Sequence, residues 1–270
     1  NTTIDRVGAR YITQFADESD GWFPPGPDGI ELNGNGSVFE NSTIASSAGD
    51  GVYIGGDNVS VLNNTFHDID YSGTDAAGVR SYGTNALIRS NTIYNAGRDG
   101  INFRQGGVNI LGNTIHDVML QTADGGGIYT FSTDGQGDAI AYNTIYNVTP
   151  TSTVSWADGA GIMLDNDSHN YVVHDNTTWN VDAGLKLNYT SLNETVYGNK
   201  LAANKSAIET NGWVGFAYDW SGSQFHDNVY YNPNVMMGLN VVQWGNTFAT
   251  GSPVPTPLPS PPALLPGDID

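Results

Sequence analysis

A short recurring phrase constrains the fold of this chain more than any other feature. The phrase starts with asparagine, threonine and an apolar residue, as in NTIYNA (91–96), NTIHDV (113–118) and NTIYNV (143–148). The shortest regular spacings are the 22 residues from Asn91 to Asn113 and the 23 residues from Asn176 to Asn199. Fixed spacing of this kind indicates stacked structural repeats. The anchor asparagines are Asn41, Asn64, Asn91, Asn113, Asn143, Asn176, Asn199, Asn228 and Asn246.

Each repeat divides into three short strands. One strand precedes the anchor, as in LIRSN (87–91), and a second follows it, as in TIYNV (144–148). The third starts with glycine and an aliphatic residue, as in GINFR (100–104). Alternation with a period of two turns every second side chain to the same face. This pattern places six isoleucines inside: Ile93, Ile101, Ile115, Ile128, Ile145 and Ile162.

A five-residue strand with one apolar face is not stable alone, but coils stacked at about 4.8 Å bury that face and pair the backbone groups. The sequence therefore predicts an all-β fold: a right-handed, single-stranded parallel β-helix of about nine coils with three short parallel sheets. We assign residues 1–249 to this domain. The anchor asparagines, from Asn41 to Asn228, are expected to stack at one corner and bond from coil to coil. Residues 250–270 contain seven prolines and form a linker or tail.

The phrase N-T-I-x-[DN]-V, in register over roughly residues 28–248, resembles the right-handed parallel β-helix repeat superfamily. That superfamily is dominated by polysaccharide lyases, glycoside hydrolases and epimerases, with some adhesins and phage tailspikes. The stretches ADGGGIYT (123–130) and GIMLDNDSHN (161–170) are similar to segments of extracellular β-helix glycosidases. The resemblance implies a secreted or cell-surface protein whose partner is a polysaccharide substrate or another glycan ligand.

The two ends of the chain suggest a larger protein. The chain opens at Asn1 inside a repeat, so we expect a piece trimmed from something longer. The last four residues, GDID (267–270), resemble the start of a dockerin-like calcium-binding repeat. That resemblance implies a structural Ca²⁺ in a module after the linker, whereas the chemistry considered below requires no cofactor.

Charge and composition exclude several classes of function. The formal net charge is -19, from 28 acidic and 9 basic residues, which argues against binding to nucleic acid or to an anionic membrane. The sequence has no run of 18 apolar residues, so no membrane span is expected. The absence of cysteine excludes disulfides and thiolate metal sites. His169 and His174 have no partner at metal-ligand spacing, and no metal site is predicted.

Three insertions fall at one corner of neighbouring coils. They occupy residues 69–75, 119–124 and 149–158, each between the strand after the anchor and the strand that starts with glycine. Loops inserted at one corner of a stack form a wall along one face, where repeat proteins usually bind their ligands. We interpret this face as a groove around the coils from residue 75 to residue 190.

Outward side chains of the glycine-started strands form two columns beside this wall. Aromatic rings next to fixed polar groups suit a sugar, which has apolar ring faces and a hydroxyl rim. Substrate binding is therefore predicted for Arg80, Tyr82, Arg104, Tyr129, Phe131, Trp156, Lys186 and Glu209. Another outward column either widens the sugar surface or stabilises the stack: His67, Tyr94, His116, Tyr146, Trp179 and Tyr231.

Hydrolysis of a glycosidic bond needs two carboxyl groups, one as proton donor and one as nucleophile or base. Asp124 and Asp158 are predicted one coil apart at the rim, and Asp165 faces out from the adjoining strand. We therefore predict that these three aspartates are catalytic. The competing interpretation is that an aspartate before glycine simply caps the corner, because Asp28, Asp50, Asp99 and Asp182 hold similar places.

Elimination on a uronate polymer is the second enzymatic hypothesis. A lyase would use Lys186 or Tyr129 as base, and Arg80 or Arg104 would neutralise the substrate carboxylate. Lys186 is expected three coils from Arg104, or roughly 14 Å at 4.8 Å per coil, which is too far for one reacting sugar. Hydrolysis therefore ranks first.

Two hypotheses without catalysis remain. The chain could be an adhesin or filament subunit, because an open β-helix end is an unpaired edge that favours end-to-end self-association. It could also be a carbohydrate-binding β-helix that has lost its activity. Polymers visible by electron microscopy would support the filament, and glycan binding that survives Asp124→Asn and Asp158→Asn would support the binding module.

Overall fold

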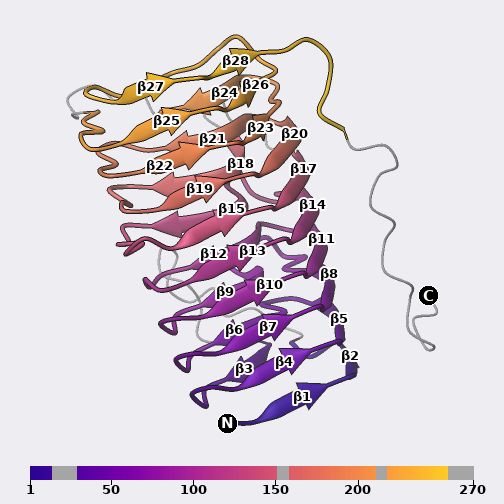
Figure 1. The fold of residues 1–270 in the computed structure, drawn as a ribbon. Helices are drawn as coiled ribbons and strands as arrows, with labels where there is room; N and C mark the ends of the chain where they lie inside the picture. The colour runs from indigo at the N-terminus through magenta and orange to yellow at the C-terminus, as the bar shows by residue number, and fades with distance from the viewer. Residues whose placement is uncertain (14–28, 151–157, 211–217, 255–270) are drawn as a thin grey trace.

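The computed structural model describes residues 1–13, 29–150, 158–210 and 218–254, and there the chain winds into a parallel β-helix (Figure 1). Every full coil adds one strand to each of three sheets, which have 10, 10 and 8 strands. The described residues contain no helix. The predicted all-β fold with three parallel sheets is therefore confirmed.

The three sheets are named A, B and C. Sheet A consists of β1 (Thr3–Asp5), β4 (Val38–Glu40), β7 (Ser60–Leu62), β10 (Leu87–Arg89), β13 (Asn109–Leu111), β16 (Ala139–Ala141), β19 (Val172–His174), β22 (Thr195–Tyr197), β25 (Gln224–His226) and β27 (Val242–Trp244). Sheet B consists of β2 (Gly8–Arg10), β5 (Thr43–Ser47), β8 (Thr65–Ile69), β11 (Thr92–Ala96), β14 (Thr114–Val118), β17 (Thr144–Val148), β20 (Thr177–Val181), β23 (Lys200–Leu201), β26 (Val229–Tyr230) and β28 (Thr247–Phe248). Sheet C consists of β3 (Ile30–Leu32), β6 (Val52–Ile54), β9 (Ala77–Ser81), β12 (Asp99–Phe103), β15 (Asp124–Phe131), β18 (Asp158–Asp165), β21 (Ala183–Leu187) and β24 (Ser206–Glu209).

The core is a set of apolar columns that run through the coils. In sheet B, Ile93 pairs with Ile115, and Ile115 pairs with Ile145. In sheet C an equivalent column joins Ile101, Ile128 and Ile162. All six side chains have zero exposure, as the period-two pattern predicts. Burying each isoleucine stabilises the fold by about 1.5–3 kcal/mol.

A buried column of asparagine side chains runs beside this core. The Nδ2 of Asn113 donates to the Oδ1 of Asn143 at 3.0 Å and to the backbone oxygen of Ile88 at 3.0 Å. The backbone N–H of Asn113 also donates to Asn143 Oδ1, at 2.9 Å. The same side-chain bond, at 2.9 or 3.0 Å, links Asn64, Asn91, Asn113, Asn143, Asn176, Asn199, Asn228 and Asn246 in order.

Asn41 does not belong to the buried column, and its predicted place there was wrong. Its side chain is exposed, its φ is 51°, and it donates to Asp5 and accepts from Asn63. Ser42 takes the buried position, because its backbone N–H donates to Asn64 Oδ1 at 2.9 Å. The two adjacent asparagines of the next coil, Asn63 and Asn64, divide these two roles between them. When the repeats are aligned by sequence, either Asn63 or Asn64 can be matched to Asn41. The alignment is therefore ambiguous by one residue at this coil.

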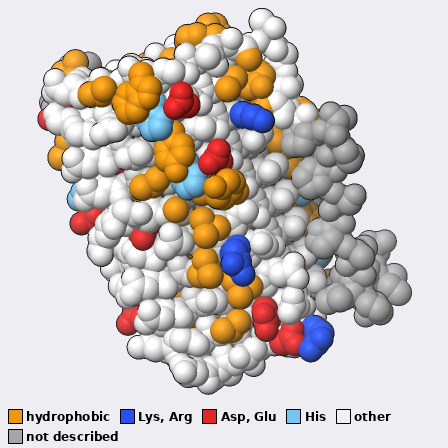
Figure 2. Space-filling model, viewed as in Figure 1, with side chains coloured by type: hydrophobic (Ala, Val, Ile, Leu, Met, Phe, Trp, Pro, Cys, Tyr) orange, Lys and Arg blue, Asp and Glu red, His pale blue; other side chains and the backbone are white. Residues whose placement is uncertain are grey.

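Rings also stack along the outer surface, at centroid distances of 4.3 to 5.1 Å with nearly parallel planes. On sheet B the stack is His67, Tyr94, His116, Tyr146 and Trp179. Tyr231 lies beyond it, because Ala202 occupies the intervening coil. A second stack, not predicted, follows sheet A, where apolar and histidine side chains form a stripe (Figure 2). Its members are His174, Tyr197, His226 and Trp244.

Candidate functional site

The outer face of sheet C carries a continuous column of large side chains. Strand register places Tyr53, Arg80, Asn102, Tyr129, Met163, Lys186 and Glu209 on successive coils. Although they point away from the core, Arg80, Tyr129 and Lys186 are at most 3% exposed. Charged side chains that are buried in this way need polar partners from the protein in place of water. This face is therefore a preorganised polar surface and not a row of solvated side chains.

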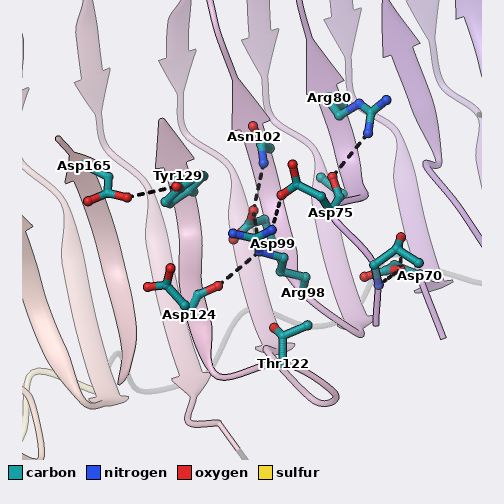
Figure 3. Close-up of polar contacts among 12 residues, drawn as sticks. Asp70, Asp75, Arg80, Arg98, Asp99, Asn102, Thr122, Asp124, Tyr129 and Asp165 are labelled. Carbon is teal, nitrogen blue, oxygen red and sulfur yellow. Dashed lines mark hydrogen bonds and ion pairs between the residues drawn. The ribbon is translucent and has the colours of Figure 1, made fainter. Parts of the chain in front are cut away.

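Tyr129 and Asp165 form the centre of this surface (Figure 3). The phenol of Tyr129 donates to Asp165 Oδ2 at 2.9 Å, and the Nδ2 of Asn188 donates to Asp165 Oδ1. Burial raises the pKa of the Asp165 carboxyl, the bond from Asn188 opposes this rise, and the negative charge of Asp124 adds to it. Burial likewise raises the pKa of Tyr129. Asp165 is therefore a carboxyl group that holds its proton more strongly than an ordinary aspartate.

Two arginines lie over the Tyr129 ring. The guanidinium groups of Arg98 and Arg104 lie 5.3 and 5.1 Å from its centroid. Arg98 is ion-paired with Asp75 (Figure 3). Arg104 lies 3.5 Å from the same carboxylate. Burial tends to lower the pKa of Arg98, but the charges of Asp99 and Asp75 outweigh it and raise that pKa. The loop that ends at Asp75 thus fixes both cations beside Tyr129.

Asp124 and Phe131 stand at the two ends of β15 and are both exposed. Asp124 is the register partner of Asp158 on the next coil, and its backbone oxygen accepts a 3.0 Å bond from Arg98 Nε. Phe131 is 41% exposed, and the guanidinium of Arg104 lies 5.4 Å from its ring centroid. An accessible carboxylate and an accessible ring therefore flank the buried Tyr129–Asp165 pair.

A second charged group lies further along the column. Lys186 is ion-paired with Asp158 and lies 3.5 Å from Glu209, while Lys205 lies 3.1 Å from Asp182 and 3.8 Å from Asp158. Burial and the hydrogen bond with Asp158 raise the pKa of Glu209 to about 7. Burial tends to raise the pKa of Asp158, but the bonds from Glu209 and Lys186 outweigh it and lower that pKa. Glu209 consequently holds the proton that the two carboxyl groups share.

Arg80 and Tyr82 lie two coils before Tyr129. Arg80 Nε lies 3.1 Å from Asp50 Oδ2, and its guanidinium lies 5.4 and 5.8 Å from the rings of Tyr53 and Tyr82. Its NH1 also donates to the backbone oxygen of Asp75 at 3.2 Å. Trp156, also predicted to bind substrate, lies outside the described residues.

The aspartates that precede glycine differ in their hydrogen bonds. Asp50 and Asp99 accept bonds of 2.9 Å from the backbone N–H groups of Ala77 and Gly126 on the next coil, as corner caps do. Within the described residues, the Asp124 carboxylate takes no such bond. The capping interpretation therefore accounts for Asp50 and Asp99 but not for Asp124.

Sequence reasoning overlooked Arg98 and Lys205. Arg98 contacts Asp75, Asp99, Asp124 and Tyr129. One signal could have identified both cations: the chain has only 9 basic residues, and five of them (Arg80, Arg98, Arg104, Lys186 and Lys205) lie on this face.

Asp70, at the base of the 69–75 insertion, makes the stability of the site sensitive to pH. It has zero exposure, and burial raises its pKa to about 7 although the backbone and hydroxyl of Thr74 both donate to Oδ1 at 2.7 Å. A carboxyl group whose pKa is raised by folding adds stability below its unfolded value of about 4 and loses that contribution as pH rises through 7.

At pH 8 the free energy of unfolding of Asp70→Asn should therefore exceed that of the parent by roughly 2–4 kcal/mol. Near pH 4 the two free energies should be equal. Asparagine keeps the acceptor for Thr74 and tolerates the φ of 52°. Denaturant titrations at the two pH values measure the difference. The control is Asp68→Asn, a neighbouring position at φ 55° whose side chain is 49% exposed, and it should show no such change. Equal stabilities of parent and Asp70→Asn at pH 8 would contradict this account.

Metal and membrane features can be assessed for the described parts of the chain. No group of three or more histidine, aspartate or glutamate side chains there is arranged to hold a metal ion. No helix in those residues is long and apolar enough to cross a membrane.

Comparisons with known proteins agree with this architecture. The family described as the right-handed β-helix region matches residues 28–252, and the chain belongs to this family. The handedness predicted from the sequence is thereby confirmed. No curated protein matches the sequence.

The fold is also similar to solved structures. Two variants of the periplasmic alginate epimerase AlgG are 17% identical, with TM-scores of 0.58 and 0.56. The matches cover 88% and 79% of this chain, and 55% and 50% of the epimerase chains. The Dettilon tailspike protein is 15% identical with a TM-score of 0.48, over 91% of this chain and 53% of the tailspike. This chain therefore spans about half the length of the epimerase chains, and its likeness to them is one of fold.

Proposed function

We propose that this protein is a secreted carbohydrate-active enzyme that hydrolyses a polysaccharide on the outer face of sheet C. One observation carries the proposal. Asp124 and Asp165 lie close enough for the charge of one to raise the pKa of the other, yet one carboxyl group is exposed and the other is buried beneath Tyr129. Two carboxyl groups in contrasting environments form the pattern that divides acid and base roles between them.

Asp165 is the proton donor in this proposal. Burial raises the pKa of its carboxyl, which favours the protonated form, and Tyr129 and Asn188 hold its two oxygens in place. As the glycosidic bond breaks, the proton passes from Asp165 to the leaving oxygen, and the Asp124 carboxylate attacks the anomeric carbon or activates a water molecule. Arg98 holds the Asp124 backbone in position.

Sugar binding is assigned to the groups around this pair. The exposed Phe131 ring offers a face on which a sugar can stack, and Arg104 donates hydrogen bonds beside it. Lys186 contributes a buried cation one coil beyond Met163 and is held by Asp158 and Glu209. Aspartates outnumber the basic residues on this face. This excess favours binding of a neutral polymer over an anionic one.

Chemistry on a uronate polymer is the second candidate. Arg98 and Arg104 both lie over Tyr129 and could neutralise a substrate carboxylate while a proton is removed beside it. AlgG is a periplasmic alginate epimerase, and the similarity of its fold supports an extracytoplasmic polysaccharide function in general. Arg104 and Lys186 are three coils apart in the sheet register, so Tyr129 and not Lys186 would act in this alternative.

A panel of neutral and uronate polysaccharides distinguishes these candidates. The parent protein should release reducing ends from a neutral polymer without forming ultraviolet-absorbing products. Unsaturated products would establish elimination instead, and a change of uronate configuration without chain cleavage, read by NMR, would establish epimerisation. Glycan binding without turnover of any polymer would identify a binding module and overturn the enzymatic proposal.

A further inference from the structure

A hollow of about 230 Å³ lies beside the Asp165 end of sheet C and is lined by Asp167, His169, Thr190 and Leu192. Two successive corner segments form it, residues 166–171 after β18 and residues 188–194 after β21. Because β18 ends at Asp165 itself, the hollow begins two residues from the carboxyl group proposed above as proton donor.

A buried chain of hydrogen bonds supports the floor of this hollow. Ser168 Oγ donates to the backbone oxygen of Asp165 at 2.7 Å, and Ser191 Oγ donates to the backbone oxygen of Ser168 at 2.8 Å. Glu194 Oε1 lies 3.0 Å from Ser191 Oγ, and Glu194 Oε2 accepts a 2.9 Å bond from the Tyr171 N–H.

Glu194 ends this chain of bonds as a buried carboxyl group. Burial raises its pKa well above the usual range, although the bonds that it accepts from the Ser191 hydroxyl and the Tyr171 N–H oppose this rise. Ser168, Ser191 and Glu194 have zero exposure, and the chain of bonds links them to the backbone of Asp165. The hollow and the proposed proton donor are therefore held in a fixed relation, as preorganised binding requires.

The lining groups suit the hydroxyls of a neutral sugar. Leu192 is half-buried and offers an apolar surface, while the Asp167 carboxylate is exposed and accepts hydrogen bonds. His169 Nδ1 donates to the backbone oxygen of Asp167 at 2.7 Å, which leaves Nε2 as an acceptor. Asp134, 3.9 Å from that nitrogen, adds a second negative charge, and the described lining contains no lysine or arginine. An anionic sugar would be repelled here.

We propose that this hollow is a subsite for one neutral sugar residue of the chain that is cleaved at Asp165. The inference rests on the proposed function and narrows its substrate class. The volume is below the 300 Å³ or more of typical sites for drug-sized ligands, and therefore fits a single sugar ring. Asp167 and His169 are the specificity-determining residues.

Steady-state kinetics on a neutral oligosaccharide tests the role of Asp167. Asp167→Asn should raise KM about ten-fold, because a charge-assisted bond to a hydroxyl is lost, and should leave kcat within about two-fold. It should also lower the ratio of kcat/KM for neutral oligosaccharides to kcat/KM for uronate oligosaccharides. The matched control is Asp227→Asn. Asp227 and Asp167 are both exposed aspartates at positive φ, 55° and 63°, and each bonds to a histidine. Equal KM values for the two variants would overturn the subsite.

Direct binding is measured on the inactive variant Asp165→Asn. The chain has 5 histidines, and the other four stack in the rings of sheets A and B, so their NMR signals are internal controls. A neutral oligosaccharide should shift the His169 signal and leave the other four in place. Binding that leaves His169 unmoved would overturn the subsite alone. No turnover and no binding of any glycan by the parent would overturn the proposed function as well.

Discussion

Asp165→Asn is expected to lower kcat on the polysaccharide by about 10²- to 10⁴-fold, the usual contribution of a general acid. The amide is nearly the same size as the carboxyl, its oxygen can still accept from Asn188, and its Nδ2 can donate to the Tyr129 oxygen. The variant therefore loses the transferable proton and keeps its place in the sheet. Initial rates of reducing-end release, measured with a thermal denaturation curve, separate catalysis from folding.

The control for this experiment is Asp117→Asn. Asp117 is a half-buried aspartate on sheet B that bonds to His116, away from sheet C. Its replacement should leave kcat unchanged. Full activity of Asp165→Asn would remove Asp165 from the mechanism. A loss of activity in which the melting curve also collapses would contradict the isosteric replacement that is assumed here.

Asn143→Ala should have the largest effect on stability, lowering the free energy of unfolding by roughly 3–5 kcal/mol. The Oδ1 of Asn143 accepts from the backbone and side chain of Asn113, and its Nδ2 donates to Ile110 and Asn176. Alanine leaves these buried donors and acceptors without partners, and each unpaired group costs about 1–3 kcal/mol.

Denaturant titration measures this loss against Asn204→Ala. Asn204 is exposed and makes a single 3.4 Å side-chain bond to Asn180, so its removal should cost less than about 0.5 kcal/mol. Similar stabilities for the two variants would show that the buried asparagine column contributes no more than surface bonds do.

Much of the site could be predicted from the sequence, because the spacing of the repeats gives the strand register. The repeat alone placed Arg80, Tyr129 and Lys186 in one outward column, and the paired strands put them there. The sequence did not predict that Arg98 would lie over Tyr129 or that Asp158 would pair with Lys186. Long side chains reach across coils, and their final contacts depend on competition among several neighbours for the same charge.

The sequence by itself determined the coil, the three strands per coil and the inward isoleucines, because side-chain period and repeat length leave one stacking solution. Only the tertiary structure decided that burial would raise the pKa of Asp165. Asp124 and Asp165 are the same residue type on adjoining strands, yet one is exposed and the other is buried against Tyr129 and Asn188. Desolvation is a property of everything packed around a group, and residues from different coils supply it together.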